Sequence, residues 1–170
     1  MQKIIFITGG ARSGKSTFAF TEASKISGKK AYIATAEALD EEMQLRIENH
    51  KRQRGDDWIT YEEPLKIANV IKKIKGEYNV IIIECLTLWL SNLIHAGLNI
   101  EAEIEHLISS LITRYSSLVY IVSNEVGMGI VPENEMVRRF RDMAGLLNQK
   151  IAEVADEVYL VTAGIPLKIK

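Results

Sequence analysis

The chain has 170 residues, of which 47% are hydrophobic and 25% charged, and its formal net charge is -1. This length and composition are ordinary for one globular domain, so we predict a single domain over residues 1–170. The nearly neutral charge leaves no broad basic surface, so a nucleic-acid role is disfavoured and any basic patch must be local.

The cysteine content and the apolar runs bear on the compartment. Cys85 has no second cysteine with which to form an internal disulfide, which suits a reducing compartment. The N-terminus lacks the order of a signal peptide, and no apolar run reaches the ~18 residues of a membrane span. We therefore predict a cytoplasmic protein without a membrane span.

Short β-branched runs alternate with amphipathic stretches along the chain. Strands are predicted at 3–8, 30–35, 57–61, 78–84, 118–123, 157–162 and 165–169. Helices are predicted at 15–27, 39–54, 64–75, 86–96, 101–116 and 134–155. The alternation predicts an α/β fold, with a mainly parallel sheet flanked by helices. Ala163-Gly164 forms a tight turn between the last two strands, which predicts a C-terminal antiparallel hairpin with Pro166 on an edge strand.

A glycine-rich loop follows the first predicted strand. Residues 9–16 read Gly-Gly-Ala-Arg-Ser-Gly-Lys-Ser, a complete G-x-x-x-x-G-K-S phosphate-binding loop (P-loop). Its backbone N–H groups and the following helix N-terminus favour phosphate, Lys15 is expected to reach the β- and γ-phosphates, and the Ser16 hydroxyl to bind Mg²⁺. The motif predicts nucleoside triphosphate binding through Gly9, Gly10, Ala11, Arg12, Ser13, Gly14, Lys15 and Ser16.

A carboxylate ends the apolar run Val80-Ile81-Ile82-Ile83-Glu84. Nucleotide-binding sheets present an acid from such a position beside the phosphate loop. Glu84 is therefore our candidate for magnesium or its water shell. The alternative is a carboxylate that caps the next helix.

The predicted helix 39–54 has two distinct faces. Leu39, Met43 and Ile47 recur every four residues and are expected to pack on the core, while Glu42, Arg46, His50 and Arg54 recur with the same step on another face. With Lys51 and Arg52 also adjacent, several cationic donors would surround the imidazole of His50. The arrangement would suit a phosphate site built around a histidine nucleophile. On composition alone, however, a solvated basic face with an incidental histidine is the favoured interpretation, since runs of charge are mostly solvated.

The other histidines and the tryptophans lack such surroundings. His95 and His106 lie in amphipathic contexts without phosphate-binding neighbours, so we expect surface or packing roles. Trp58 and Trp89 are expected to pack in the core.

Residues 124–134 form a loop after the predicted strand 118–123. The loop contains two glycines and several apolar side chains, and it is expected at the carboxyl edge of the sheet, where ligands of open α/β sheets bind. It is either a lid or wall for a large, partly apolar substrate or an ordinary connection.

Five segments together carry a family resemblance. They are Thr8-Gly9-Gly10-Ala11-Arg12-Ser13-Gly14-Lys15-Ser16, Tyr32-Ile33-Ala34-Thr35-Ala36, Arg46-Ile47-Glu48-Asn49-His50, Glu84-Cys85-Leu86-Thr87 and Asn124-Glu125-Val126-Gly127-Met128-Gly129-Ile130-Val131-Pro132. The chain resembles the bifunctional adenosylcobinamide kinase/adenosylcobinamide-phosphate guanylyltransferase family of cobalamin biosynthesis. The resemblance implies a RecA-like P-loop NTPase fold and a homotrimer.

The resemblance also implies two reactions. In the first, a primary hydroxyl of adenosylcobinamide takes the γ-phosphoryl group of ATP or GTP. In the second, GTP transfers GMP to a histidine with loss of pyrophosphate, and adenosylcobinamide phosphate then takes the GMP to give adenosylcobinamide-GDP. A divalent cation such as Mg²⁺ is implied as the cofactor.

The same resemblance assigns roles to individual residues. The guanylylated histidine falls on His50, and Lys15 is the other catalytic residue. Besides the P-loop, the implied nucleotide contacts are Ala34, Thr35, Ala36, Lys51, Arg52, Gln53, Arg54, Glu62 and Glu84, with Ser16 and Glu84 at the metal. Two positions depart from the family pattern: Phe20 stands where an acidic residue is common, and Arg54-Gly55 where Arg-Pro is common.

Two other functions use the same loop. A small-metabolite kinase would form no covalent adduct, and a nucleotide-dependent switch ATPase would be indifferent to a corrinoid. The sequence alone does not rank ATP against GTP.

Overall fold

The computed structural model describes residues 3–38, 41, 44, 45, 47, 48, 51, 55, 57–113 and 116–170. Within these residues, seven strands form one sheet in the order β3-β2-β4-β5-β1-β6-β7. Their bounds are β1 Lys3–Thr8, β2 Lys30–Ala34, β3 Trp58–Glu62, β4 Val80–Glu84, β5 Leu118–Val122, β6 Glu157–Thr162 and β7 Ile165–Lys168.

The helices connect these strands in the predicted order. Their bounds are α1 Lys15–Ser24, α3 Ile67–Ile74, α4 Leu86–His95, α5 Ile100–Ile112 and α6 Glu135–Val154. Of the predicted helix 39–54, the described residues 41, 44, 45, 47, 48 and 51 have helical backbone, whereas Leu39, Glu42, Met43, Arg46, His50 and Arg54 lie outside the described residues.

The sheet is parallel except at one edge. β1 pairs in parallel with β5 and β6, whereas β6 and β7 form an antiparallel pair. Pro166 lies on β7, the edge strand, where the missing N–H group costs no ladder hydrogen bond. The predicted α/β class, parallel core and C-terminal hairpin are confirmed.

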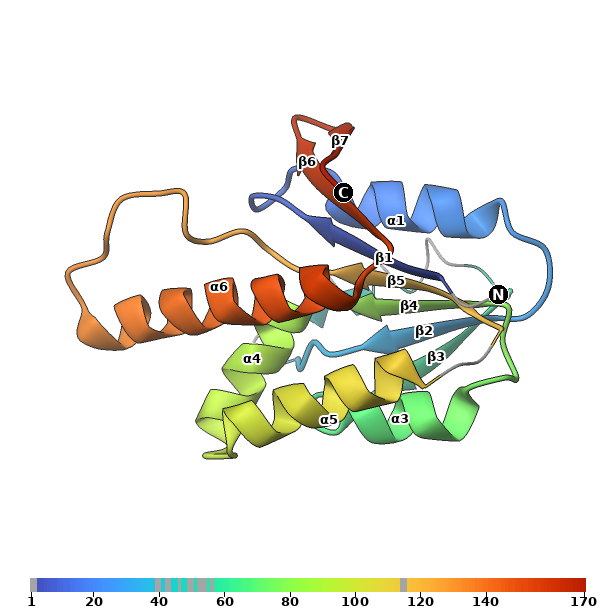
Figure 1. Ribbon diagram of the computed structural model, residues 1–170, viewed down its shortest axis with the longest axis horizontal. Helices are drawn as coiled ribbons and strands as arrows, with labels where there is room; N and C mark the ends of the chain where they lie inside the picture. Colours follow the sequence, from blue (N-terminus) through green and yellow to red (C-terminus); the bar gives the residue numbers. More distant parts are fainter. Residues whose placement is uncertain are drawn as a thin grey trace.

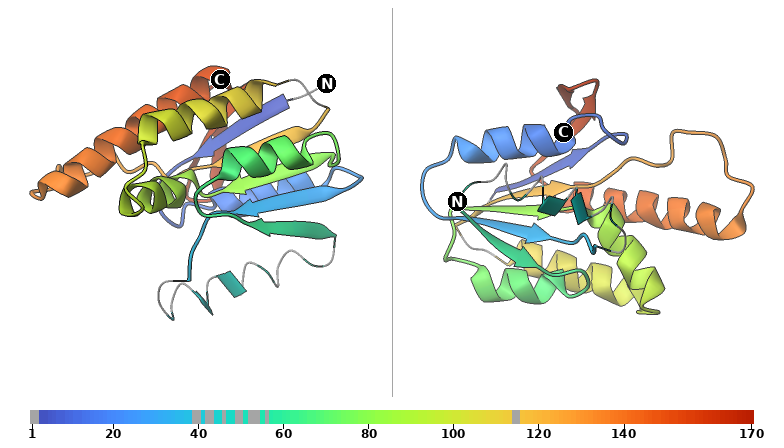
Figure 2. Two further views of the ribbon diagram at one scale, coloured as in Figure 1. Left: turned by 90° about the horizontal axis from the view of Figure 1, so that it is seen from below. Right: turned by 180° about the vertical axis from the view of Figure 1, so that it is seen from behind.

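Helices cover both faces of the sheet unequally. Among the helices of the described residues, Figure 1 shows α1 on one face and α3, α4, α5 and α6 toward the other, and Figure 2 shows α5 and α6 side by side. Two buried clusters follow this division, a large one between the sheet and α3–α6 and a smaller one beneath α1. The hydrophobic side of each helix is therefore buried against one sheet, and the carboxyl ends of β1, β2, β4 and β5 are left for the site.

Both tryptophans are packing residues, as predicted. The Nε1 of Trp89 donates to the carbonyl oxygen of Leu65 at 2.7 Å, and its side chain is fully buried. Trp58 is buried beneath α1, where its ring centroid lies 5.3 Å from that of Phe20. A phenylalanine at position 20 thus extends the core on this face.

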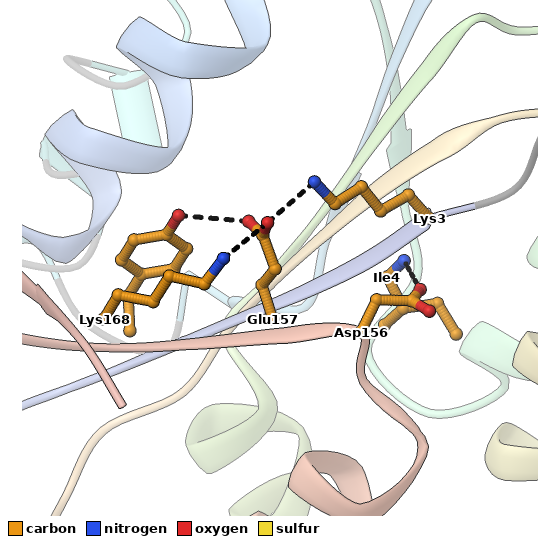
Figure 3. Close-up of polar contacts among 6 residues, drawn as sticks. Lys3, Ile4, Asp156, Glu157 and Lys168 are labelled. Atoms are coloured by element: carbon orange, nitrogen blue, oxygen red, sulfur yellow. Dashed lines mark hydrogen bonds and ion pairs between the residues drawn. The ribbon is translucent and has the colours of Figure 1, made fainter. Parts of the chain in front are cut away.

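The Glu157 carboxylate, at the start of β6, links both strands of the C-terminal hairpin to β1. Glu157 accepts hydrogen bonds from Lys3 Nζ at 2.8 Å, Lys168 Nζ at 2.7 Å and Tyr159 OH at 3.0 Å, as Figure 3 shows. Donation by Lys168, and then by Lys3, lowers the pKa of Glu157 from 4.5 to about 2. Each of these donors favours the ionised carboxylate.

We expect Glu157→Gln to lower the free energy of unfolding by about 1 kcal/mol near neutral pH, since both lysines are partly exposed to solvent. Because the pKa of Glu157 is lowered on folding, its contribution is complete above its ordinary pKa of 4.5 and is lost as the pH falls toward 2. Urea unfolding at a series of pH values measures this. A stability difference that stays constant as the medium is acidified would contradict the role of the charge.

No helix among the described residues combines the length and the apolar character needed to cross a membrane.

Candidate active site

The P-loop lies between β1 and α1. Gly14 is the N-cap of α1 with φ 97°, and Gly9 has φ 151°, so both occupy backbone regions that favour glycine. The N-cap provides no side-chain hydrogen bond to the helix, and the first turn contains no acidic residue. The free N–H groups and the positive end of the α1 dipole thus remain available to an anion.

The C-terminal hairpin packs against this loop. The Gly164 N–H donates to the Ser13 carbonyl oxygen at 2.8 Å. A Cβ atom on Gly9 would come within 2.3 Å of the Val161 carbonyl oxygen, and one on Gly14 within 3.1 Å of Gly164 Cα. The glycines of the motif therefore serve two needs, the turn itself and the close approach of the hairpin.

Lys15 is the buried cation of the loop. Its residue is 5% exposed, and its Nζ donates to the Gly10 carbonyl oxygen at 2.6 Å. Burial lowers the pKa of Lys15, and the neighbouring Cys85 and Glu84 oppose part of that change. A phosphate at the loop would add negative charge beside this amine and favour its protonated form.

Glu84 lies at the carboxyl end of β4 and points toward the P-loop. In the parallel pair of β2 and β4, Ala34 lies opposite Glu84. The Ser16 hydroxyl donates to Oε1 of Glu84, and the Tyr32 hydroxyl donates to Oε2 at 2.8 Å. The Glu84 carboxylate thus contacts the end of the P-loop and does not cap α4, whose N-cap residue is Cys85.

The ends of β2 and β4 are joined through Thr35. The fully buried Thr35 hydroxyl donates to the Cys85 carbonyl oxygen at 2.8 Å and accepts from the Cys85 N–H at 2.7 Å. The Asn92 side-chain amide donates to the Thr35 carbonyl oxygen at 2.8 Å. Burial raises the pKa of the Cys85 thiol, which keeps it protonated and unreactive. Thr35 thus influences the site indirectly, because its hydroxyl fixes the backbone of Cys85, which follows Glu84.

A cavity of about 620 Å³ lies over these groups. It is lined by Ala11, Arg12, Ser13, Gly14, Lys15, Ser16, Thr17, Tyr32, Ala34, Ala36, Ile47, Glu84, Cys85, Leu88, Val122 and Asn124. Its size suits a nucleotide. Most of the predicted P-loop residues, together with Ala34, Ala36 and Glu84, therefore meet around one space.

Of the predicted contacts, Gly9, Gly10 and Thr35 are not among the residues that line the cavity. The other predicted residues fall into two groups. Lys51 and Glu62 form an ion pair with each other, with both side chains partly exposed. His50, Arg52, Gln53 and Arg54 lie outside the described residues. Ile47 lines the cavity, and it precedes His50 by three positions in the sequence.

Seven residues that line the cavity were not predicted as site residues: Thr17, Tyr32, Ile47, Cys85, Leu88, Val122 and Asn124. Tyr32 was identifiable, because it precedes Ala34 by two positions and side chains at that spacing share one face of a strand. Asn124 begins the loop that was expected at the ligand-binding edge of the sheet, whereas Leu88 carried no comparable signal.

The loop 123–134 begins beside the P-loop. The Glu125 N–H donates to the Gly9 carbonyl oxygen at 2.8 Å, and the Glu125 carboxylate accepts from the N–H groups of Gly127 and Met128. Met128 is 78% exposed and Ile130 is 96% exposed. The loop thus presents apolar side chains to solvent from an anchored base, which is unusual for an ordinary connection.

The groups at the cavity suit a hard divalent cation. A hydroxyl and a carboxylate supply only oxygen, as Mg²⁺ prefers, and such an ion usually relies on substrate phosphates for further ligands. The described residues contain no cluster of three or more His, Cys, Asp or Glu that would form an all-protein cage.

Comparison with known proteins places this chain in a family. The family model described as "Cobinamide kinase / cobinamide phosphate guanyltransferase" (CobU) matches residues 5–169. The "Bifunctional adenosylcobalamin biosynthesis protein CobU" of Escherichia coli (strain K12) is 41% identical over 182 residues, covering 98% of this chain and 99% of that protein. The protein of the same name from Salmonella typhimurium is 42% identical over 185 residues, covering 98% of this chain and 99% of that protein.

A solved structure extends the comparison to the fold. An ATPase from the type III secretion system of pathogenic bacteria superposes with a TM-score of 0.58 at 10% identity. The match covers 98% of this chain but 56% of the ATPase chain, and it bears on the fold alone. The predicted P-loop NTPase fold and the family resemblance are both confirmed. The chain belongs to the cobinamide kinase/cobinamide phosphate guanylyltransferase family and is a bifunctional enzyme of cobalamin biosynthesis.

Proposed function

We propose that one nucleotide cavity serves both reactions of this chain. In the first, the primary hydroxyl of adenosylcobinamide takes the γ-phosphoryl group of ATP or GTP. In the second, GMP passes from GTP to adenosylcobinamide phosphate and pyrophosphate leaves. The observation that carries the proposal is that the P-loop, Glu84 and Ile47, which lies near His50 in the sequence, line the same cavity.

In the kinase step the protein mainly positions and neutralises charge. The P-loop N–H groups hold the phosphates, and the Lys15 ammonium faces the negative charge of the β- and γ-phosphates. Ser16 and Glu84 would hold a divalent cation between them and the nucleotide, and the cation when bound would withdraw charge from the phosphates.

In the transferase step His50 is the nucleophile. A nitrogen of its neutral imidazole attacks the α-phosphorus of GTP, so that a P–N bond forms and the P–O bond to pyrophosphate breaks. A phosphate oxygen of adenosylcobinamide phosphate then attacks the same phosphorus, the P–N bond breaks, and the imidazole is released. In keeping with the family resemblance, Lys51, Arg52, Gln53, Arg54 and Glu62 would contact the nucleotide, and Lys51 and Glu62 are paired with each other.

Further features of the proposal rest on the family and on the chain's charge. We propose that residues 1–170 are one catalytic domain, because one sheet runs from β1 to β7. We also propose that the enzyme is a cytoplasmic homotrimer without a nucleic-acid partner, in keeping with the family resemblance and the net charge of -1.

The exposed apolar loop is assigned to the corrinoid. Met128 and Ile130 lie on a segment whose base is bonded to the P-loop, at the edge of the sheet where the transferred phosphoryl group must meet the corrinoid. Contact with a large, partly apolar substrate would bury these side chains and give a reason for their exposure without it.

Turnover of adenosylcobinamide with ATP and then GTP, followed by mass spectrometry of the corrinoid, tests the proposal. We expect the phosphate to form with either nucleotide and the GDP derivative to form only when GTP is present. The double change Met128→Ser and Ile130→Ser is expected to raise the KM for adenosylcobinamide about tenfold through lost apolar burial, with the KM for nucleotide unchanged. Ile112→Ser, at an equally apolar and 57% exposed position at the end of α5, is the matched control. Nucleotide consumption that is indifferent to the corrinoid would contradict the function, and a loop variant with unchanged KM would contradict the corrinoid contact.

A further inference from the structure

The Glu84 carboxylate is held by two hydroxyl groups that come from different elements. Ser16 on α1 donates to Oε1, and Tyr32 on β2 donates to Oε2 at 2.8 Å. Tyr32 is only 6% exposed, yet it lines the nucleotide cavity. Its hydroxyl is therefore at the inner wall of the site, and it engages the carboxylate oxygen that Ser16 does not.

Strand register explains how the tyrosine reaches this carboxylate. Tyr32 lies opposite Ile82 in the parallel pair of β2 and β4, two residues before the pair of Ala34 and Glu84. Residues two apart share one face of a sheet, so Tyr32 and Glu84 point to the same side, toward α1. The long tyrosine side chain spans the offset, and its ring is fixed edge-on to Trp58 with 6.4 Å between the ring centroids.

Glutamate at this position requires such support. P-loop enzymes often hold the cation with an aspartate, whose carboxylate is one rotatable bond closer to the backbone. The longer glutamate has one more torsion to restrict before its oxygens are fixed in place. A second hydrogen bond, to Oε2, restricts the torsion that donation by Ser16 alone would leave free.

We propose that Tyr32 is a positioning residue that fixes the orientation of Glu84 for the divalent cation that accompanies the nucleotide. With Oε2 held by Tyr32, Oε1 stays in place to accept from Ser16, and the lone pairs of the Ser16 oxygen stay available to the cation. The inference rests on the proposed role of Ser16 and Glu84 at that cation. A tyrosine that served only as a packing residue would act through its ring, which phenylalanine retains.

Tyr32→Phe separates these two roles. The test uses a GTP analogue with a methylene group between the α- and β-phosphates, which cannot transfer GMP to the protein. Its affinity is measured by calorimetry in EDTA and in excess Mg²⁺, and the ratio of the two affinities is the gain due to the cation. We expect Tyr32→Phe to bind the analogue as the wild type does in EDTA but to show a gain about tenfold smaller, as expected for one lost hydrogen bond to a charged group. The kcat of the kinase step should fall by a similar factor, with the KM for adenosylcobinamide unchanged.

The chain supplies a matched control. Tyr159 donates to Oε2 of Glu157 at 3.0 Å and packs its ring on Phe18, and it is not among the residues that line the cavity. Tyr159→Phe removes the same kind of hydrogen bond and should leave the gain due to Mg²⁺ at the wild-type value.

Glu84→Gln distinguishes failure of the inference from failure of the cation site. We expect Glu84→Gln to lose most of the gain, and Tyr32→Phe to have no further effect in that background. If Glu84→Gln loses the gain but Tyr32→Phe keeps it, the positioning role is overturned while the cation site stands. If Glu84→Gln keeps the gain, the cation site and the role of Tyr32 are both overturned. Thermal unfolding of each variant shows that the comparison is between folded proteins.

Discussion

Lys15→Met is expected to lower kcat/KM for both the phosphorylation of adenosylcobinamide and the transfer of GMP, each by roughly a thousandfold. The side chain keeps about the same length but loses the buried positive charge that the P-loop directs at the phosphates. Lys15 is 5% exposed, so water would replace the lost ammonium poorly. Because one cavity is proposed to bind the nucleotide in both reactions, both should fail together. Steady-state rates of each reaction, measured separately with adenosylcobinamide and with its phosphate, provide the test.

Lys25→Met is the control for the loss of a lysine near α1. Lys25 follows the last residue of α1, and its side chain is 62% exposed and paired with Glu22. Neither rate should change in this variant. Loss of only one of the two reactions in Lys15→Met would show that the other uses a different nucleotide site.

His50→Ala is expected to separate the two reactions. Without a nucleophile the GMP transfer should fall by more than about a thousandfold, as is typical when the residue that forms a covalent intermediate is removed. The phosphorylation step requires no bond to His50 and should stay within about twofold of the wild type, since the P-loop is unchanged. The two rates, measured on the same preparation, provide their own internal comparison.

The other histidines provide matched substitutions. His95 and His106 are both exposed, on α4 and α5 respectively. His95→Ala and His106→Ala should retain both activities. A His50→Ala variant that still transfers GMP would contradict this prediction. The basic residues around His50 would then form a solvated face without a catalytic role.

Patterns of apolar residues predicted the fold because each strand and helix satisfies a local requirement. The run Val80-Ile81-Ile82-Ile83 is apolar on both faces, as a strand covered by helices on both sides must be. Pro166 and the Ala163-Gly164 turn indicated an edge hairpin, and β7 occupies that edge.

Element boundaries were less well predicted where side chains compete with the helix. A helix was expected from residue 64, but α3 begins at Ile67. The Glu63 carboxylate accepts from the N–H groups of Leu65 and Lys66, which fixes a turn ahead of the helix. The spacing of apolar residues along the sequence does not reveal these local hydrogen bonds.

The site was predicted as far as it follows from a continuous motif. The P-loop and Glu84 could be recognised in the sequence, since the P-loop follows one apolar strand and Glu84 ends another. The bond between Tyr32 and Glu84 depends on the register of two strands that are 50 residues apart in the sequence, and the support of Ser13 by Gly164 depends on the far end of the chain. Contacts of this kind arise only when the sheet assembles, because no local preference specifies them.

Intact-mass analysis of the chain after incubation with GTP and Mg²⁺ tests most directly whether GMP transfer passes through His50. We predict one acid-labile GMP group per chain, release of pyrophosphate in step with it, and assignment of the group to the peptide that contains His50. Addition of adenosylcobinamide phosphate should remove the group and yield adenosylcobinamide-GDP. A GMP group that persists in His50→Ala, or transfer by the wild type without any covalent group, would contradict the account.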